Sequence, residues 1–102
     1  MVDGDFTLWE SNAIMQCLAG SKLNSLWPDG ARVRAGIARW HFWQVAHWHE
    51  GNAGFIWENV VKKLMGGGDP DAAALKQAGE DFHRDARVLD GQLGNHLYLV
   101  IC

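Results

Sequence analysis

Two adjacent residues near the N-terminus, Glu10 and Ser11, have the chemistry and the position to bind an anion. They directly precede apolar residues with helical spacing, which places them at the start of a predicted helix. A serine hydroxyl and the first backbone N–H groups of a helix can bind an anion there, and the helix dipole favours it. An ordinary helix cap remains the alternative, with Ser11 as the N-cap and Glu10 as a favourable charge in the first turn.

Histidines and a cysteine are the other residues with chemical potential. His41, His47 and His49, with Glu50, could suggest a metal site. His47 and His49 are two residues apart, however, and therefore point to nearly opposite faces of a helix. Zinc motifs such as His-Glu-x-x-His are missing, so we predict no metal and interpret these histidines as solvated or hydrogen-bonded. Cys17 lies on an apolar helix face and is predicted to be an inert buried thiol rather than a nucleophile.

Length and composition limit the possible classes of protein. The chain has 102 residues, enough for one small domain, and is 48% hydrophobic with six tryptophans. The net charge is −3 with dispersed basic residues, which argues against nucleic acid or an anionic membrane as a partner. We expect no secretory signal and no membrane span. Two cysteines make no disulfide framework, so we expect a cytoplasmic location.

The N-terminal residues predict a small hairpin. Asp3-Gly4 is a strong tight-turn pair, because glycine accepts a positive φ without steric cost. Phe6 and Leu8 alternate with polar neighbours, as in a half-buried strand. The first strand is expected to be too short to pair usefully.

The rest of the chain is predicted to be helical. Gly51 and Gly54 predict a break or a kink, and Asp69 followed by Pro70 predicts a capped helix start. Gly94 is expected to end that last helix. The predicted helices cover residues 11–19, 30–50, 55–65 and 71–93. The last helix has a continuous apolar stripe formed by Leu75, Ala78, Phe82, Ala86, Leu89 and Leu93.

Three stretches together resemble the glutathione transferase family. The run from Asp3 to Ile14 resembles its glutathione-binding signature: a hairpin strand, an acidic residue, serine, and a helix beginning Asn-Ala-Ile. The later stretches resemble, in the same order, the first long helix of the family's helical domain, and then the next long helix with the loop beyond it. They are Arg34-Ala35, Arg39-Trp40 and Trp43-Gln44, then Asp69-Pro70-Asp71, Phe82, Val88-Leu89-Asp90, Leu93 and Tyr98-Leu99-Val100.

The resemblance implies a bacterial glutathione transferase segment with an all-α helical bundle and a short N-terminal hairpin. Residues 1–20 would be a remnant of the thioredoxin-like domain, and residues 21–102 part of the C-terminal helical domain. Glu10 and Ser11 would bind glutathione as substrate or weak ligand. Trp40, Trp43 and His47 would line the pocket of a small-molecule electrophile, although an aromatic stripe at this spacing also fits a helical core.

The resemblance also implies that the family's thiol-activating segment lies outside this sequence. No catalytic residue is therefore assigned, and we expect a truncated chain without conjugating activity of its own. The alternative is a non-catalytic helical module for dimerisation or interaction. In either case we expect a homodimer, because apolar helix faces would otherwise lack cover.

Overall fold

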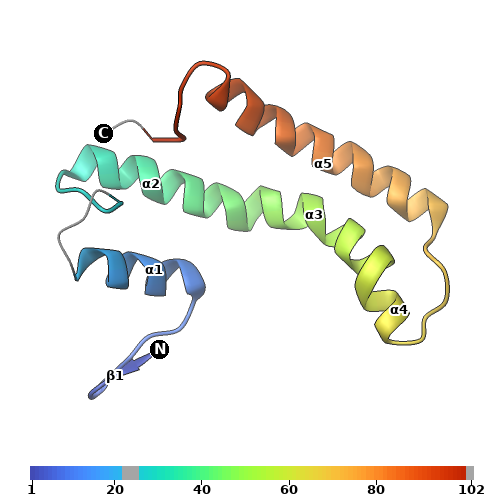
Figure 1. Cartoon of the computed structure of the whole chain (residues 1–102), viewed down its shortest axis with the longest axis horizontal. Coiled ribbons are helices and arrows are strands. Elements are labelled where there is room, and N and C mark those ends of the chain that lie inside the picture. The colour runs from blue at the N-terminus through green and yellow to red at the C-terminus, as the bar shows by residue number, and fades with distance from the viewer. Residues whose placement is uncertain (22–25, 101–102) are drawn as a thin grey trace. The chain divides into compact units, whose positions relative to one another are not determined.

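The computed structural model describes residues 1–21 and 26–100, and these are mainly helical (Figure 1). The predicted all-α class with a small hairpin is confirmed. Two compact units are present, one from Met1 to His41 and one that begins at Phe42. The predicted domain boundary near residue 20 stays a prediction. The elements are β1 (Val2–Asp3), β2 (Phe6–Thr7), α1 (Ser11–Gly20), α2 (Ala31–Trp43), the π-helical segment η1 (Gln44–Trp48), α3 (His49–Ile56), the π-helical segment η2 (Trp57–Val61), α4 (Lys62–Leu64) and α5 (Ala72–Leu93).

The hairpin forms around the predicted turn. Asp3 is opposite Phe6 and Gly4 has φ 61°, as the Asp-Gly pair requires. The expectation that the first strand is too short to pair is wrong. The Met1 ammonium donates to the Leu8 carbonyl at 2.8 Å and the Leu8 N–H donates back to the Met1 carbonyl at 2.9 Å. These two bonds extend the ladder past the strand ends and fix the direction in which the chain approaches α1.

The side chain of Arg34 contacts the residues that precede α2. The guanidinium of Arg34 donates to the Asp29 carboxylate at 2.8 Å and to the Pro28 carbonyl at 3.0 Å, and it lies over the Trp27 ring at 5.5 Å. Gly30, directly before the helix, has φ 124°, a conformation that suits glycine. The helix begins one residue after the predicted position, at Ala31.

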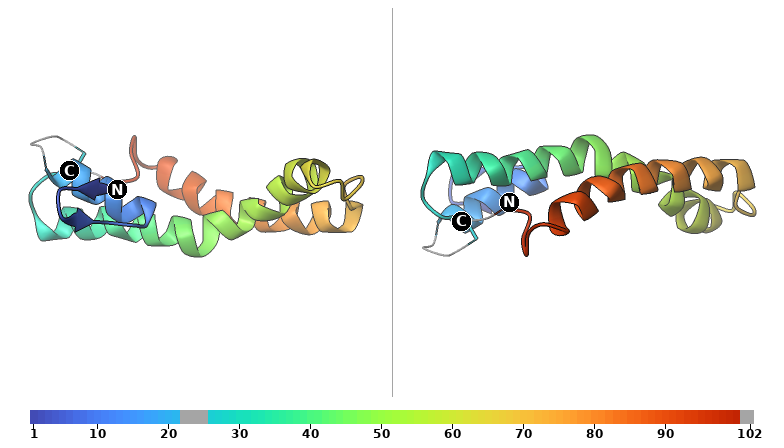
Figure 2. Two further views of the ribbon diagram at one scale, coloured as in Figure 1. Left: turned by 90° about the horizontal axis from the view of Figure 1, so that it is seen from below. Right: turned by 90° about the horizontal axis from the view of Figure 1, so that it is seen from above.

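The second unit is built on the packing of α5 against α3 (Figures 1 and 2). The predicted break at Gly51 and Gly54 is wrong, because α3 runs through both residues, while the alternative of a kink there stays a prediction. Their missing side chains instead allow α5 to approach closely. A Cβ built on Gly54 would lie 2.8 Å from the Ala78 Cβ, and one on Gly51 would overlap the Asp85 carboxylate. Glycine at these two positions therefore allows the close contact between α3 and α5.

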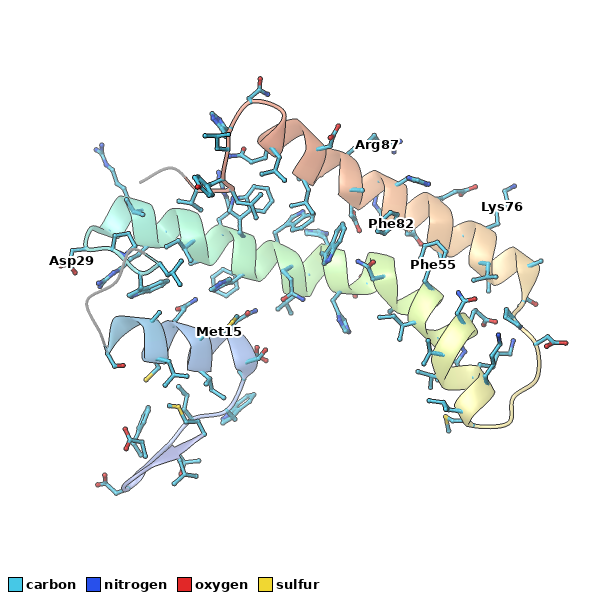
Figure 3. All side chains as sticks on the ribbon, viewed as in Figure 1. Met15, Asp29, Phe55, Lys76, Phe82 and Arg87 are labelled. Carbon is cyan, nitrogen blue, oxygen red and sulfur yellow. The ribbon has the colours of Figure 1, made fainter. Side chains whose placement is uncertain are left out.

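Aromatic rings also contribute to the packing of the second unit. Phe82 of α5 lies 5.5 Å from Trp48 and 6.0 Å from Phe55 between ring centroids, and Figure 3 shows the two phenylalanines between the helices. Lys76 and Arg87 lie on the outer side of α5, as the spacing predicts. Along the predicted stripe from Leu75 to Leu89, Ala78 is buried and the other residues are half-buried, whereas Leu93 is exposed.

The start of α5 differs from the prediction. Asp71 rather than Asp69 is the N-cap, and its carboxylate accepts the Ala74 N–H at 2.8 Å. Pro70 therefore precedes the cap instead of occupying the first turn. Gly94 is the C-cap, as expected, but with φ −62° instead of a left-handed conformation.

Candidate functional site

The turn between the hairpin and α1 has an unusual backbone. Glu10 has φ 75° and ψ 119°, and it is the one non-glycine residue with positive φ among residues 1–21 and 26–100. Such a conformation costs about 1–3 kcal/mol and persists only when the surroundings hold it. Glu10 is also the N-cap, because its Oε1 accepts the Asn12 N–H at 3.2 Å. The alternative in which Ser11 is the N-cap is wrong: Ser11 is the first residue of α1, and its hydroxyl donates to the same Oε1 at 3.4 Å.

This geometry determines what the turn can bind. Glu10 and Ser11 are both exposed, so a ligand has access to the carboxylate, the hydroxyl and the first turn of α1. The first N–H groups of a helix need acceptors from outside the helix, and the dipole makes anions the favoured partner. A simple anion would be repelled by the Glu10 carboxylate. A ligand that carries both an ammonium and a carboxylate group could satisfy Glu10 and the helix start together.

A second layer of polar contacts holds α1 against α2 within the first unit. Asn12 Nδ2 donates to the His41 carbonyl at 3.5 Å, and Gln16 Nε2 lies 2.9 Å from His41 Nδ1. All three residues are half-buried. His41 is thus hydrogen-bonded, as interpreted from the sequence. Its pairing with Gln16 was not predicted, because the two residues are 25 positions apart and share no motif.

Trp40, Trp43 and His47 are on the long run of helices that begins at α2. Trp40 is half-buried under the guanidinium of Arg39, which lies 5.6 Å from the ring centroid. The ring of Trp43 lies 5.8 Å from that of Trp48 between centroids and so joins the half-buried aromatic cluster of the second unit. His47 is exposed on η1. This ring contact favours the core interpretation for Trp43, while the electrophile pocket stays a prediction.

Two π-helical segments interrupt this run of helices. The His49 N–H donates to the Gln44 carbonyl and the Lys62 N–H to the Trp57 carbonyl, each five residues back. Such segments are uncommon and are frequent at functional sites. η1 contains His47 and directly follows Trp43, two of the residues predicted to line a pocket. No sequence signal indicated these segments.

Two acidic side chains of the second unit are buried, Glu58 and Asp85. Glu58 Oε2 accepts the Asp71 N–H at 2.7 Å and the Lys62 ammonium at 2.9 Å. These bonds hold the pKa of Glu58 below its ordinary value of 4.5. Asp85 packs on Gly51 and pairs with the Arg84 guanidinium, which raises the pKa of Arg84. Both groups join elements of the fold, and we assign them no role in binding.

Cys17 is exposed, so the prediction of a buried thiol is wrong. The helix face it shares with Leu18, itself 55% exposed, is not covered by the part of the chain that the structure describes. Within residues 1–21 and 26–100 no group of three metal-binding side chains is close enough to hold an ion. Over the same residues, every helix is too short or too polar to cross a membrane.

A comparison with known proteins gives one informative match. The chain is 31% identical to glutathione S-transferase 3 of Zea mays over 102 residues, covering 97% of this chain and 45% of that protein. It thus spans less than half the length of this relative. No family model and no solved structure matches the chain. The match supports a relationship to glutathione transferases, in agreement with the resemblance of residues 3–14.

Proposed function

We propose that this chain is a segment of a glutathione transferase and that its turn at Glu10 and Ser11 binds the γ-glutamyl end of glutathione. The Glu10 turn itself carries the proposal, because a strained, exposed glutamate caps the helix where the family's signature falls. The ligand carboxylate would bind the Ser11 hydroxyl and the first turn of α1. The ligand ammonium would bind Glu10, whose carboxylate then turns away from the Asn12 N–H. A zwitterionic ligand end suits this exchange of partners. Its carboxylate would accept hydrogen bonds at the helix start in place of Glu10, and its ammonium would pair with the Glu10 carboxylate.

A titration with two peptides tests this proposal. Glutathione and its analogue without the α-ammonium group are added to the labelled chain, and the amide resonances of residues 11–13 are followed by NMR. Glutathione should shift these resonances with a dissociation constant in the millimolar range, about −4 kcal/mol, because the turn offers only part of a site. The analogue should bind at least about tenfold more weakly, the worth of one charge-assisted bond.

Serine variants supply the matched control. Ser11→Ala removes the hydroxyl at the proposed site and should weaken glutathione binding. Ser21→Ala removes an exposed hydroxyl at the other end of α1, where it donates to the Leu18 carbonyl, and should leave binding unchanged. Equal binding of both peptides, or equal effects of both substitutions, would contradict the proposal.

Conjugation is a separate matter, and we propose that residues 1–102 alone do not catalyse it. A glutathione thiolate near neutral pH needs a hydroxyl or a cation held at the sulfur, and we assign that role to no residue of this chain. The assay is conjugation of glutathione to an aryl halide against the uncatalysed background. A protein-dependent rate that Ser11→Ala abolishes would refute this part. Trp40, Trp43 and His47 remain the residues proposed for the electrophile, and a cytoplasmic location is part of the same proposal.

We also propose that the chain forms a homodimer through its apolar surface. Ala78 is the one buried hydrophobic residue in the described part of the chain, whereas every element except α5 has a large apolar side chain that is at least half exposed. Examples on three elements are Phe6 at 50%, Leu18 at 55% and Leu64 at 82% exposure. Apolar surface of this extent is uncommon on soluble monomers. Light scattering across a dilution series should show twice the monomer mass; a folded monomer at all concentrations would exclude the dimer.

A further inference from the structure

Two hydrogen bonds join α1 to α2, and His41 is the partner on α2 in both. Asn12 and Gln16 are four residues apart, so their side chains lie one above the other on one face of α1. Asn12 Nδ2 bonds the carbonyl of His41, and Gln16 Nε2 bonds its ring at Nδ1, at 3.5 and 2.9 Å. All these atoms belong to the unit from Met1 to His41.

Asn12 connects this contact to the strained turn at Glu10. The Asn12 N–H is the group that the Glu10 carboxylate caps, while the Asn12 side chain bonds His41. Asn12 therefore links the turn to α2. The positive φ of Glu10 needs outside support, and bonds from Glu10 to its immediate neighbours cannot place the turn relative to the rest of the unit.

We propose that His41, held by Gln16, is a positioning residue for the glutathione-binding turn at Glu10 and Ser11; this rests on the proposed function. The His41 ring fixes Gln16 in the second turn of α1, and this fixes the direction of the first turn and of its N–H groups. The pairing is robust, because an amide offers both a donor and an acceptor, and Nδ1 finds a partner in either tautomer.

The test compares variants that keep or remove the ring contact. His41→Asn keeps a polar atom near the position of Nδ1, whereas His41→Leu removes it; Gln16→Met removes the partner at similar size. His49→Leu is the matched control, an exposed histidine on α3. His41→Leu and Gln16→Met should each weaken glutathione binding about threefold to tenfold, the worth of one hydrogen bond. His41→Asn and His49→Leu should stay within about twofold of the parent chain.

Combining the two substitutions identifies the mechanism. If His41 and Gln16 act as one unit, the variant with both His41→Leu and Gln16→Met should bind no more weakly than either single variant. Parent-like binding by His41→Leu would overturn the proposal. Equal losses for His41→Asn and His41→Leu would also overturn it, because packing rather than the hydrogen bond would then be the cause.

A measurement without ligand separates this proposal from the proposed function. Amide hydrogen exchange of Asn12, Ala13 and Ile14 reports how firmly the first turn is held. Exchange should be faster in His41→Leu and Gln16→Met than in His41→Asn, and unchanged in His49→Leu. If the parent chain binds no glutathione, the proposed function fails, and the exchange rates still decide whether His41 positions the turn. Equal rates in all four variants would overturn the positioning role.

Discussion

Replacing Gly54 by alanine measures how closely α3 and α5 pack. In a helix interior, alanine is more favourable than glycine by about 1 kcal/mol, so an unobstructed site would gain stability. At Gly54 the new Cβ would lie 2.8 Å from the Cβ of Ala78, well inside the optimal carbon–carbon separation of about 3.5–4.0 Å. Neither methyl group can rotate away, so the helices have to separate. Overpacking of this kind costs about 1–3 kcal/mol.

Gly91 is the matched control for this substitution. It is exposed within α5, and a Cβ built there meets no atom within 4 Å. Gly91→Ala should therefore stabilise the chain by about 1 kcal/mol. Gly54→Ala should be less stable than Gly91→Ala by about 1–3 kcal/mol, the packing term alone. Urea denaturation followed by tryptophan fluorescence at one protein concentration gives both values, since association would otherwise shift them.

A compensating substitution completes the test. Ala78→Gly removes the methyl group that the new side chain meets, so adding it to Gly54→Ala should relieve the clash. The two substitutions should then show a favourable coupling of at least about 1 kcal/mol. The packing argument is refuted if Gly54→Ala stabilises the chain as much as Gly91→Ala does, or if the coupling is zero.

Three further predictions concern single residues. The lowered pKa of Glu58 means that its charged form stabilises the fold above pH 4.5 and that this contribution is lost as the pH falls through the folded-state pKa. Glu58→Gln should therefore lower the urea midpoint by less at pH 3 than at pH 7, and an equal loss at both would contradict this. Phe82→Ala should lower the free energy of unfolding by about 3 kcal/mol in the same assay, since the ring is half-buried between Trp48 and Phe55. A loss below about 0.5 kcal/mol would show that the apolar stripe of α5 does not face a core. Glu10→Gly should raise the free energy of unfolding in the same assay by about 1 kcal/mol, because glycine accepts the positive φ. The same substitution removes the carboxylate proposed to bind the ligand. Glu10→Gln keeps the strain and should show no gain in stability.

The sequence predicts those elements whose signals are local. The Asp3-Gly4 turn and the stripe of α5 each follow from neighbouring residues, and both are found. The errors at Gly51 and Gly54 have a different cause, because the contact that explains them comes from Ala78 and Asp85, far along the chain. The same holds for the site: Glu10 and Ser11 form a local motif, whereas the pairing of Gln16 with His41 is set by how two helices pack.

Glu10 and Gly54 break opposite local rules, and only one of the two exceptions is explained by a contact within the fold. Gly54 occupies a helical position where alanine would be more favourable, and a contact within the fold explains it. Glu10 occupies a positive φ where glycine would be more favourable. Its carboxylate caps α1, but glycine is nearly as good an N-cap, so capping alone does not account for the strain. The proposed binding of a γ-glutamyl ammonium group would give the exposed carboxylate a use beyond the fold, and this use would account for the strain.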